Sequence, residues 1–136
     1  MSALEMPAPI AAWHAIARSR DLQALAALLH DDAVFHSPVV HTPQRGKAVV
    51  LRTLAGAMQV LGNASFRYVR QIHGARDSML EFTATIDGIE VNGIDLIAWD
   101  DAGRIVDFKV MLRPLKAVNI VHRKMGELLS AANPKG

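Results

Sequence analysis

The chain has 136 residues, of which 51% are hydrophobic and 21% charged, and its formal net charge is +2. This length and composition exclude an extended disordered protein and predict one domain spanning residues 1–136, with loose ends at 1–8 and 131–136. Because the basic residues are scattered and cysteine is absent, we expect no nucleic-acid partner, and disulfides and cysteine metal sites are excluded.

Targeting and membrane segments are not evident in the sequence. The N-terminus lacks a basic region followed by a continuous apolar core, and no run approaches the length that spans a bilayer. We therefore expect a cytoplasmic protein that does not bind membranes.

Two short amphipathic helices open the predicted fold. Pro9 suits the first turn of a helix, and Asp21 has the residue type of an N-cap for a second one. Apolar residues recur at helical spacing after both positions, which predicts one buried face per helix. These faces consist of Ile10, Trp13, Ile16 and Ala17, and of Leu22, Leu25, Leu28 and Leu29.

A strand, a loop and a third helix follow. The segment from Ala33 to Ser37 is rich in strand formers and ends at Pro38, so we predict a short edge strand and then a loop over residues 39–45. Gly46 introduces a helix that Gly62 and the following asparagine end. This helix is expected to pack across a sheet through Val50, Leu54, Ala57 and Leu61.

The remaining sequence predicts strands at 65–73, 79–86, 89–99 and 104–113, and a last helix from Pro114. The connections contain turn residues and are too short for anything but antiparallel neighbours. The apolar face of the last helix includes Met125 and either Val121 or His122.

The element order is therefore ααβαββββα, an α+β fold. We expect a cone-shaped, curved sheet, antiparallel or mixed, covered by three N-terminal helices and followed by a C-terminal helix, with a hollow between the layers. Ile94 and Leu96 alternate with Asp95 along one strand, so they lie on the opposite face, which we expect to form a homodimer.

Asp95 is the most informative residue, because it stands alone among apolar neighbours. A buried carboxylate costs several kcal/mol unless it is paired, protonated or open to a pocket. Asp95 is thus either a catalytic acid, oxyanion-hole donor or ligand anchor, or a structural carboxyl bonded to Trp13 or a backbone amide. Gly93, two residues earlier on the same face, is expected to leave space for a pocket.

Other side chains are candidate ligand contacts within the hollow, with core packing or, for the histidine, a solvated helix face as the alternative. They are Trp13, His14, Phe35, Ser37, Phe82, Phe108 and Val110. None of the six histidines has a metal-binding spacing to another, so we expect no metal and no cofactor.

Several segments together resemble the nuclear-transport-factor-2-like superfamily, in particular its SnoaL-like and ketosteroid-isomerase-like branch. They are Asp21, the segment 30–38 from His30 to Pro38, Gly46, Gly93-Ile94-Asp95 and the segment 101–106. The similarity covers about residues 8–130 and implies the cone fold.

In steroid isomerases of that superfamily, a tyrosine on the first helix and a protonated aspartate on a late strand bind the developing oxyanion, while an aspartate before a proline removes the proton. The resemblance places the late-strand aspartate at Asp95. It places Trp13 at the tyrosine position and Ser37 at the base position. Serine is not basic at neutral pH, so the isomerase mechanism does not transfer unchanged.

Two hypotheses remain open at the level of sequence. In the first, the protein binds a small, mostly apolar organic molecule and acts as an isomerase, cyclase or lyase, with Asp95 as acid or hydrogen-bond donor. In the second, it is a non-catalytic ligand-binding or dimerisation module. A second titratable group within hydrogen-bond reach of Asp95 favours the first hypothesis.

Overall fold

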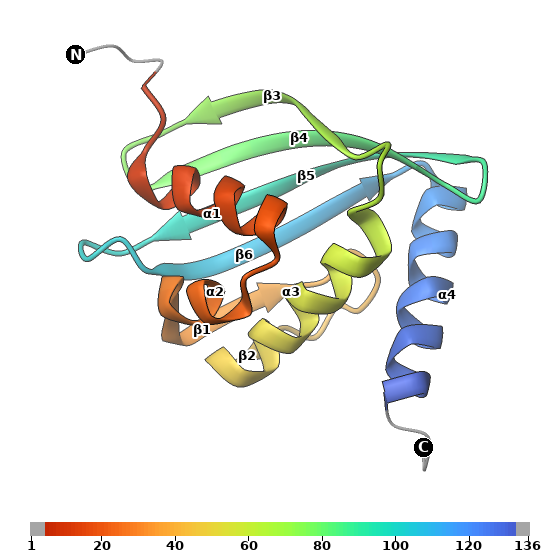
Figure 1. Ribbon diagram of the computed structural model, residues 1–136, viewed down its shortest axis with the longest axis horizontal. Coiled ribbons are helices and arrows are strands. Elements are labelled where there is room, and N and C mark those ends of the chain that lie inside the picture. Colours follow the sequence, from red (N-terminus) through yellow and green to blue (C-terminus); the bar gives the residue numbers. More distant parts are fainter. Residues whose placement is uncertain (1–4, 133–136) are drawn as a thin grey trace.

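The computed structural model of the chain describes residues 5–132 and shows a curved sheet with helices packed on it (Figure 1). The elements in chain order are α1 (Ala8–Ser19), α2 (Leu22–Leu28), β1 (Leu29–His36), β2 (Gln44–Arg45), α3 (Lys47–Leu61), β3 (Arg67–His73), β4 (Asp77–Ile86), β5 (Ile89–Trp99), β6 (Ile105–Arg113) and α4 (Leu115–Ala132). The predicted α+β order is confirmed, with one addition: β2 lies inside the expected loop over 39–45.

The six strands form one sheet in the order β2-β1-β6-β5-β4-β3. The run from β3 to β6 is an antiparallel meander, as predicted, and β1 joins it parallel to β6, which makes the sheet mixed. Helices α1, α2 and α3 lie over one face of the sheet, whereas α4 stands at the end where β6 finishes (Figure 1). The arrangement agrees with the expected cone: a curved, unclosed sheet with helices packed on it.

Several predicted boundaries require correction. The second helix ends at Leu28, and Leu29 adopts extended backbone angles and pairs with Ile105 as the first residue of β1. The apolar stripe of the helix misled the prediction, because Leu29 is fully buried as a strand residue as well. The expected loose ends at 1–8 and 131–136 overlap two helices, because α1 begins at Ala8 and α4 continues through residue 132, while residues 1–4 and 133–136 lie outside the described part.

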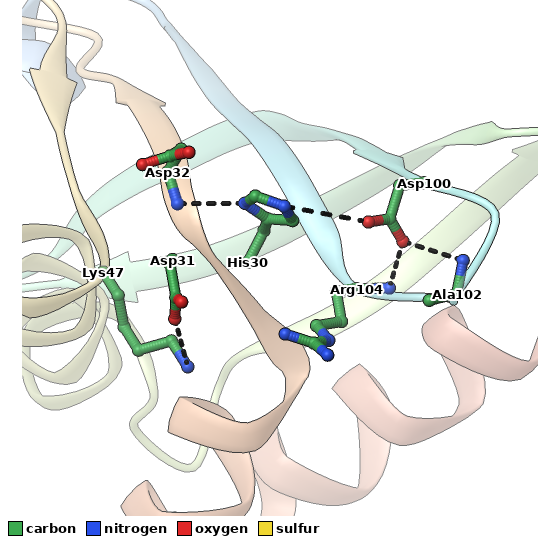
Figure 2. Close-up of polar contacts among 7 residues, drawn as sticks. All are labelled: His30, Asp31, Asp32, Lys47, Asp100, Ala102 and Arg104. Carbon is green, nitrogen blue, oxygen red and sulfur yellow. Dashed lines mark hydrogen bonds and ion pairs between the residues drawn. The ribbon is translucent and has the colours of Figure 1, made fainter.

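A polar network fastens the start of β1 to the turn between β5 and β6 (Figure 2). His30 Nδ1 accepts a hydrogen bond of 2.9 Å from the backbone N–H of Asp32, and its Nε2 lies 4.0 Å from Asp100 Oδ2. Asp100 Oδ1 accepts backbone N–H bonds of 3.0 Å from Ala102 and from Arg104. The network stabilises the turn that separates β5 from β6.

The core fills the space between the sheet and the helices. Its largest fully buried side chains are Phe82, Phe108, Ile10, Leu25, Leu29, Leu54, Leu80, Ile97 and Ile105. The other face of the sheet is more open, with Leu96 37% and Met111 49% exposed. No helix within residues 5–132 has the length and apolarity needed to cross a membrane.

Candidate functional site

An apolar cavity of about 300 Å³ lies between the sheet, α1, α3 and α4. Asp95 lines it, together with every predicted ligand contact except His14: Trp13, Phe35, Ser37, Phe82, Phe108 and Val110. The structure thus brings together residues from α1, β1, β4, β5 and β6 that the sequence singled out separately.

Three polar side chains form a chain of hydrogen bonds at the wall of this cavity. The hydroxyl of Tyr68 donates to Asp95 Oδ2 at 2.5 Å, and Trp13 Nε1 donates to the hydroxyl oxygen of Tyr68 at 2.9 Å. The direct bond to Trp13 that the sequence offered as one structural alternative for Asp95 is therefore not formed, because Tyr68 stands between them. The carboxyl has a titratable partner and is not an isolated buried charge.

Strand register explains how residues so distant in sequence meet. Tyr68 pairs with Phe82 of β4, and Asp95 pairs with Leu80 of β4, so Tyr68 and Asp95 lie two strands apart on the same face of the sheet. The Tyr68 side chain is long enough to reach Asp95 across β4. Trp13 reaches the same point from the buried face of α1.

Burial dominates the proton affinity of this pair. Removal from water raises the pKa of Asp95 from 3.8 to about 7, although the hydrogen bond from Tyr68 opposes that rise. Burial first, and then the negative charge of Asp95, raise the pKa of Tyr68 well above 10.0. Asp95 is therefore populated in both its protonated and its ionised form near neutral pH, while Tyr68 keeps its proton.

Gly93 does not leave the empty space that the sequence suggested. A Cβ built on Gly93 would lie 2.5 Å from Cζ of Phe82, 2.7 Å from Cδ2 of Leu112 and 2.8 Å from the backbone oxygen of Met111. The absence of a side chain is used for close packing beside Asp95, and the cavity is open elsewhere.

Ser37 lines the cavity, but its hydroxyl is engaged in the local turn. The hydroxyl oxygen accepts hydrogen bonds from the backbone N–H groups of Val39 at 3.0 Å and Val40 at 3.2 Å. This arrangement shapes the loop after β1 and gives the residue no route to remove a proton.

His14 lies behind the cavity wall. Its Nε2 is 3.2 Å from Oε1 of Gln71, and its ring packs edge-on against Tyr68 with centroids 5.0 Å apart. His14 thus contacts the outer side of the Tyr68 ring and is not among the residues that line the cavity.

Sequence reasoning missed two residues of the site. Tyr68 is the single tyrosine of the chain and lies in a predicted strand, yet nothing local marks its long reach across β4. His122 lines the cavity together with Val121, although the helical spacing had left a choice between the two. The ionisable side chains among the lining residues are Asp95, Tyr68 and His122.

Comparison with known proteins identifies relatives that cover most of the chain. The SnoaL-like domain matches residues 10–108. A steroid delta-isomerase from Pseudomonas aeruginosa is 42% identical, with a TM-score of 0.88 and 93% of each chain covered. An uncharacterized protein with a cystatin-like fold from Silicibacter pomeroyi is 30% identical over 91% of this chain and 86% of that one, with a TM-score of 0.83.

More distant similarity concerns the fold alone. An NTF2-like protein of unknown function from Mesorhizobium loti is 16% identical, with a TM-score of 0.67 over 78% of this chain and 88% of that one. No curated protein matches the chain. The domain match, the two closely similar structures and the cone fold agree, and the chain belongs to the SnoaL-like family, in the steroid-isomerase-like branch of the nuclear-transport-factor-2-like superfamily.

Proposed function

We propose that this protein binds a small, mostly apolar ketone or enol in its cavity and holds the ligand oxygen against Asp95 and Tyr68. The observation that carries the proposal is the Tyr68–Asp95 pair, which forms a buried, protonatable group in the wall of an otherwise largely apolar cavity. An apolar cavity selects ligands by the area they bury, and a few placed polar groups fix their orientation.

The pair is suited to stabilising negative charge that develops on a carbonyl oxygen. A protonated Asp95 donates a hydrogen bond, and it does so at near-neutral pH because burial raises its pKa to about 7. We therefore assign the reaction to the isomerase class, in which a proton moves near a carbonyl group. The identity of 42% to a steroid delta-isomerase supports this class.

The alternative is a binding module without catalysis. It is favoured by Ser37, which stands where the resemblance places the proton-abstracting aspartate and whose hydroxyl is engaged with two backbone N–H groups. A module of this kind would bind the same ligands without changing them.

Binding of 2-naphthol tests the proposal, since this apolar phenol has the shape of a bicyclic enol. Calorimetric titration below neutral pH should show saturable binding to the wild type. Asp95→Leu and Tyr68→Phe should each weaken it about tenfold or more, because the first removes the donor to the ligand oxygen and the second removes the hydroxyl that holds the Asp95 carboxyl in place. His41→Gln is the control, because His41 is exposed and does not line the cavity.

Each result has a clear meaning. Wild-type protein that does not bind 2-naphthol, or two site variants that bind it like the wild type, would rule the proposal out. Circular dichroism of each variant separates loss of the site from loss of the fold.

We also propose that two copies associate through the outer face of the sheet, where Leu96 and Met111 are exposed. Sedimentation at micromolar concentration should then give twice the chain mass of 14.8 kDa. A single-chain mass would contradict the dimer and leave the cavity proposal intact.

A further inference from the structure

We propose that His122 is the general base of this site, taking a proton from a ligand carbon next to the carbonyl group that Asp95 and Tyr68 hold. This inference rests on the proposed function. It assigns to α4 the role that the position of Ser37 cannot fill.

The first support is the chemistry of the cavity wall. Among the lining residues, the ionisable side chains are Asp95, Tyr68 and His122. Asp95 and Tyr68 are bonded to each other and together form the site for the ligand oxygen. His122 is therefore the remaining lining group whose side chain commonly exchanges protons near neutral pH.

The second support is the direction in which His122 points. His122, Met125, Gly126 and Leu129 all line the cavity, and their spacing of three, four and seven residues places them on one face of α4. The imidazole thus belongs to a continuous cavity-facing stripe, although the residue as a whole is also exposed to solvent. It can contact a bound ligand and exchange its proton with water.

The third support is the room beside the imidazole. Gly126 lies one turn after His122, and a Cβ built there would meet no atom within 4 Å. Glycine in a helix interior lowers helix stability by about 1 kcal/mol relative to alanine, so the helix itself does not favour a glycine at this position. Its effect is to keep the cavity-lining face of α4 open one turn after His122.

Ion pairs connect α4 to the turn between β4 and β5. Arg123 Nη2 and Lys124 Nζ lie 3.4 and 3.0 Å from Asp87 Oδ2, in the turn between β4 and β5. Figure 1 shows α4 standing beside that turn. Arg123 and Lys124 directly follow His122, so these ion pairs agree with the rotation of α4 that turns His122 toward the cavity.

The step balances with the groups present. A neutral imidazole nitrogen of His122 takes the proton from the carbon next to the carbonyl. The C–H electron pair forms a C=C bond, and the carbonyl pair moves to the oxygen, which receives a hydrogen bond from protonated Asp95, while the Tyr68 hydroxyl donates to the other oxygen of that carboxyl. The imidazolium then returns the proton to the same carbon, or to the γ carbon of a β,γ-unsaturated ketone, which shifts the double bond without gain or loss of atoms.

Hydrogen exchange of 2-tetralone in D₂O tests the inference, because this apolar ketone has acidic C–H groups and the same skeleton as 2-naphthol. The wild type should accelerate deuterium uptake next to the carbonyl, as followed by proton NMR. His122→Gln should lower the acceleration about a hundredfold. Its affinity for 2-naphthol should stay within about threefold of the wild type, because the oxygen-binding pair is intact.

Two further measurements separate proton transfer from a structural role. Added imidazole should restore exchange to His122→Ala, since His122 is open to solvent, but not to Asp95→Leu, which lacks the donor to the ligand oxygen. His41→Gln is the matched control and should exchange at the wild-type rate, because His41 is exposed and does not line the cavity.

The outcomes distinguish this inference from the proposed function. If His122→Gln keeps the wild-type exchange rate, or if the wild type binds 2-naphthol without accelerating exchange, His122 is not the base and the binding proposal stands. If the wild type does not bind 2-naphthol, the proposed function fails, and the assignment of His122 fails with it.

Discussion

Asp95 and Asp100 are five residues apart, one inside β5 and the other directly after it, and their environments shift their acidity in opposite directions. Burial raises the pKa of Asp95 to about 7. The pKa of Asp100 is lowered, first by the backbone N–H of Arg104 and then by that of Ala102. One carboxyl sits in the wall of an apolar cavity and the other in a solvent-accessible turn.

The difference shows which physical effect prevails at each position. Asp95 is 6% exposed and accepts a hydrogen bond from the hydroxyl of Tyr68, which does not compensate for the loss of water. Asp100 keeps a third of its side chain exposed and accepts two backbone N–H bonds, with His30 nearby (Figure 2). The first environment favours a protonated carboxyl that donates, and the second an ionised carboxyl that stabilises a turn.

The pH dependence of stability is the strongest test of this contrast. Below about pH 4, Asp95 is protonated in both folded and unfolded chains. Between about pH 4 and 7 only the unfolded chain releases this proton, so the wild type should lose stability relative to Asp95→Asn, by about 4 kcal/mol in total. Denaturant unfolding at several pH values measures the difference.

Asp100→Asn is the matched comparison, because its carboxyl has the opposite shift. The stability that ionised Asp100 contributes should be fully present above about pH 4 and should be lost as the pH falls through its lowered folded-state pKa. If both variants gave difference curves of the same sign, burial would not be the cause of the Asp95 shift.

Gly93→Ala tests the close packing beside Asp95. The new Cβ would lie 2.5 Å from the Phe82 ring and 2.8 Å from the Met111 backbone oxygen, so the strands must separate or Phe82 must move. We expect a loss of about 2 kcal/mol in unfolding free energy. Gly126→Ala is the control with the opposite expectation, a gain of up to about 1 kcal/mol, because it meets no atom and favours the helix. Equal effects of the two changes would contradict the packing argument.

The contrast between Asp95 and Asp100 also shows which features of the fold and of the site can be predicted from the sequence. Alternation along β5 predicted that Asp95 faces inward, because strand period and apolar neighbours are local properties. The turn chemistry of residues 100–103 was equally local and predicted the end of the strand. The inward-facing carboxyl and the antiparallel meander could therefore be predicted from the sequence alone.

The partners of Asp95 could not be predicted in the same way. Tyr68 reaches it across an intervening strand, and His122 comes to the cavity from a helix that follows the sheet, so both depend on tertiary packing. Gly93 shows the same limit, because the sequence alone predicted that its missing side chain leaves space for a pocket. The structure shows packing against Phe82.

Tyr68→Phe should sharpen the contrast by making the environment of Asp95 still more apolar. The hydroxyl of Tyr68 lowers the pKa of Asp95, so its removal should raise that pKa above about 7. Carboxyl carbon NMR of labelled aspartate measures the titration directly, with Asp100 as an internal reference that should not move. A lower Asp95 pKa in Tyr68→Phe would mean that the hydroxyl does not stabilise the ionised carboxyl.

The titration of Tyr68 is the smallest effect and the simplest to isolate, because the chain has one tyrosine. Burial and the charge of Asp95 raise the pKa of Tyr68 well above 10.0, so the near-ultraviolet absorbance of tyrosinate should develop at higher pH in the folded protein than in urea. Asp95→Asn removes the charge but keeps the burial, so it should move the folded curve only part of the way back. Full return to the unfolded curve would make charge, and not burial, the main cause at this site.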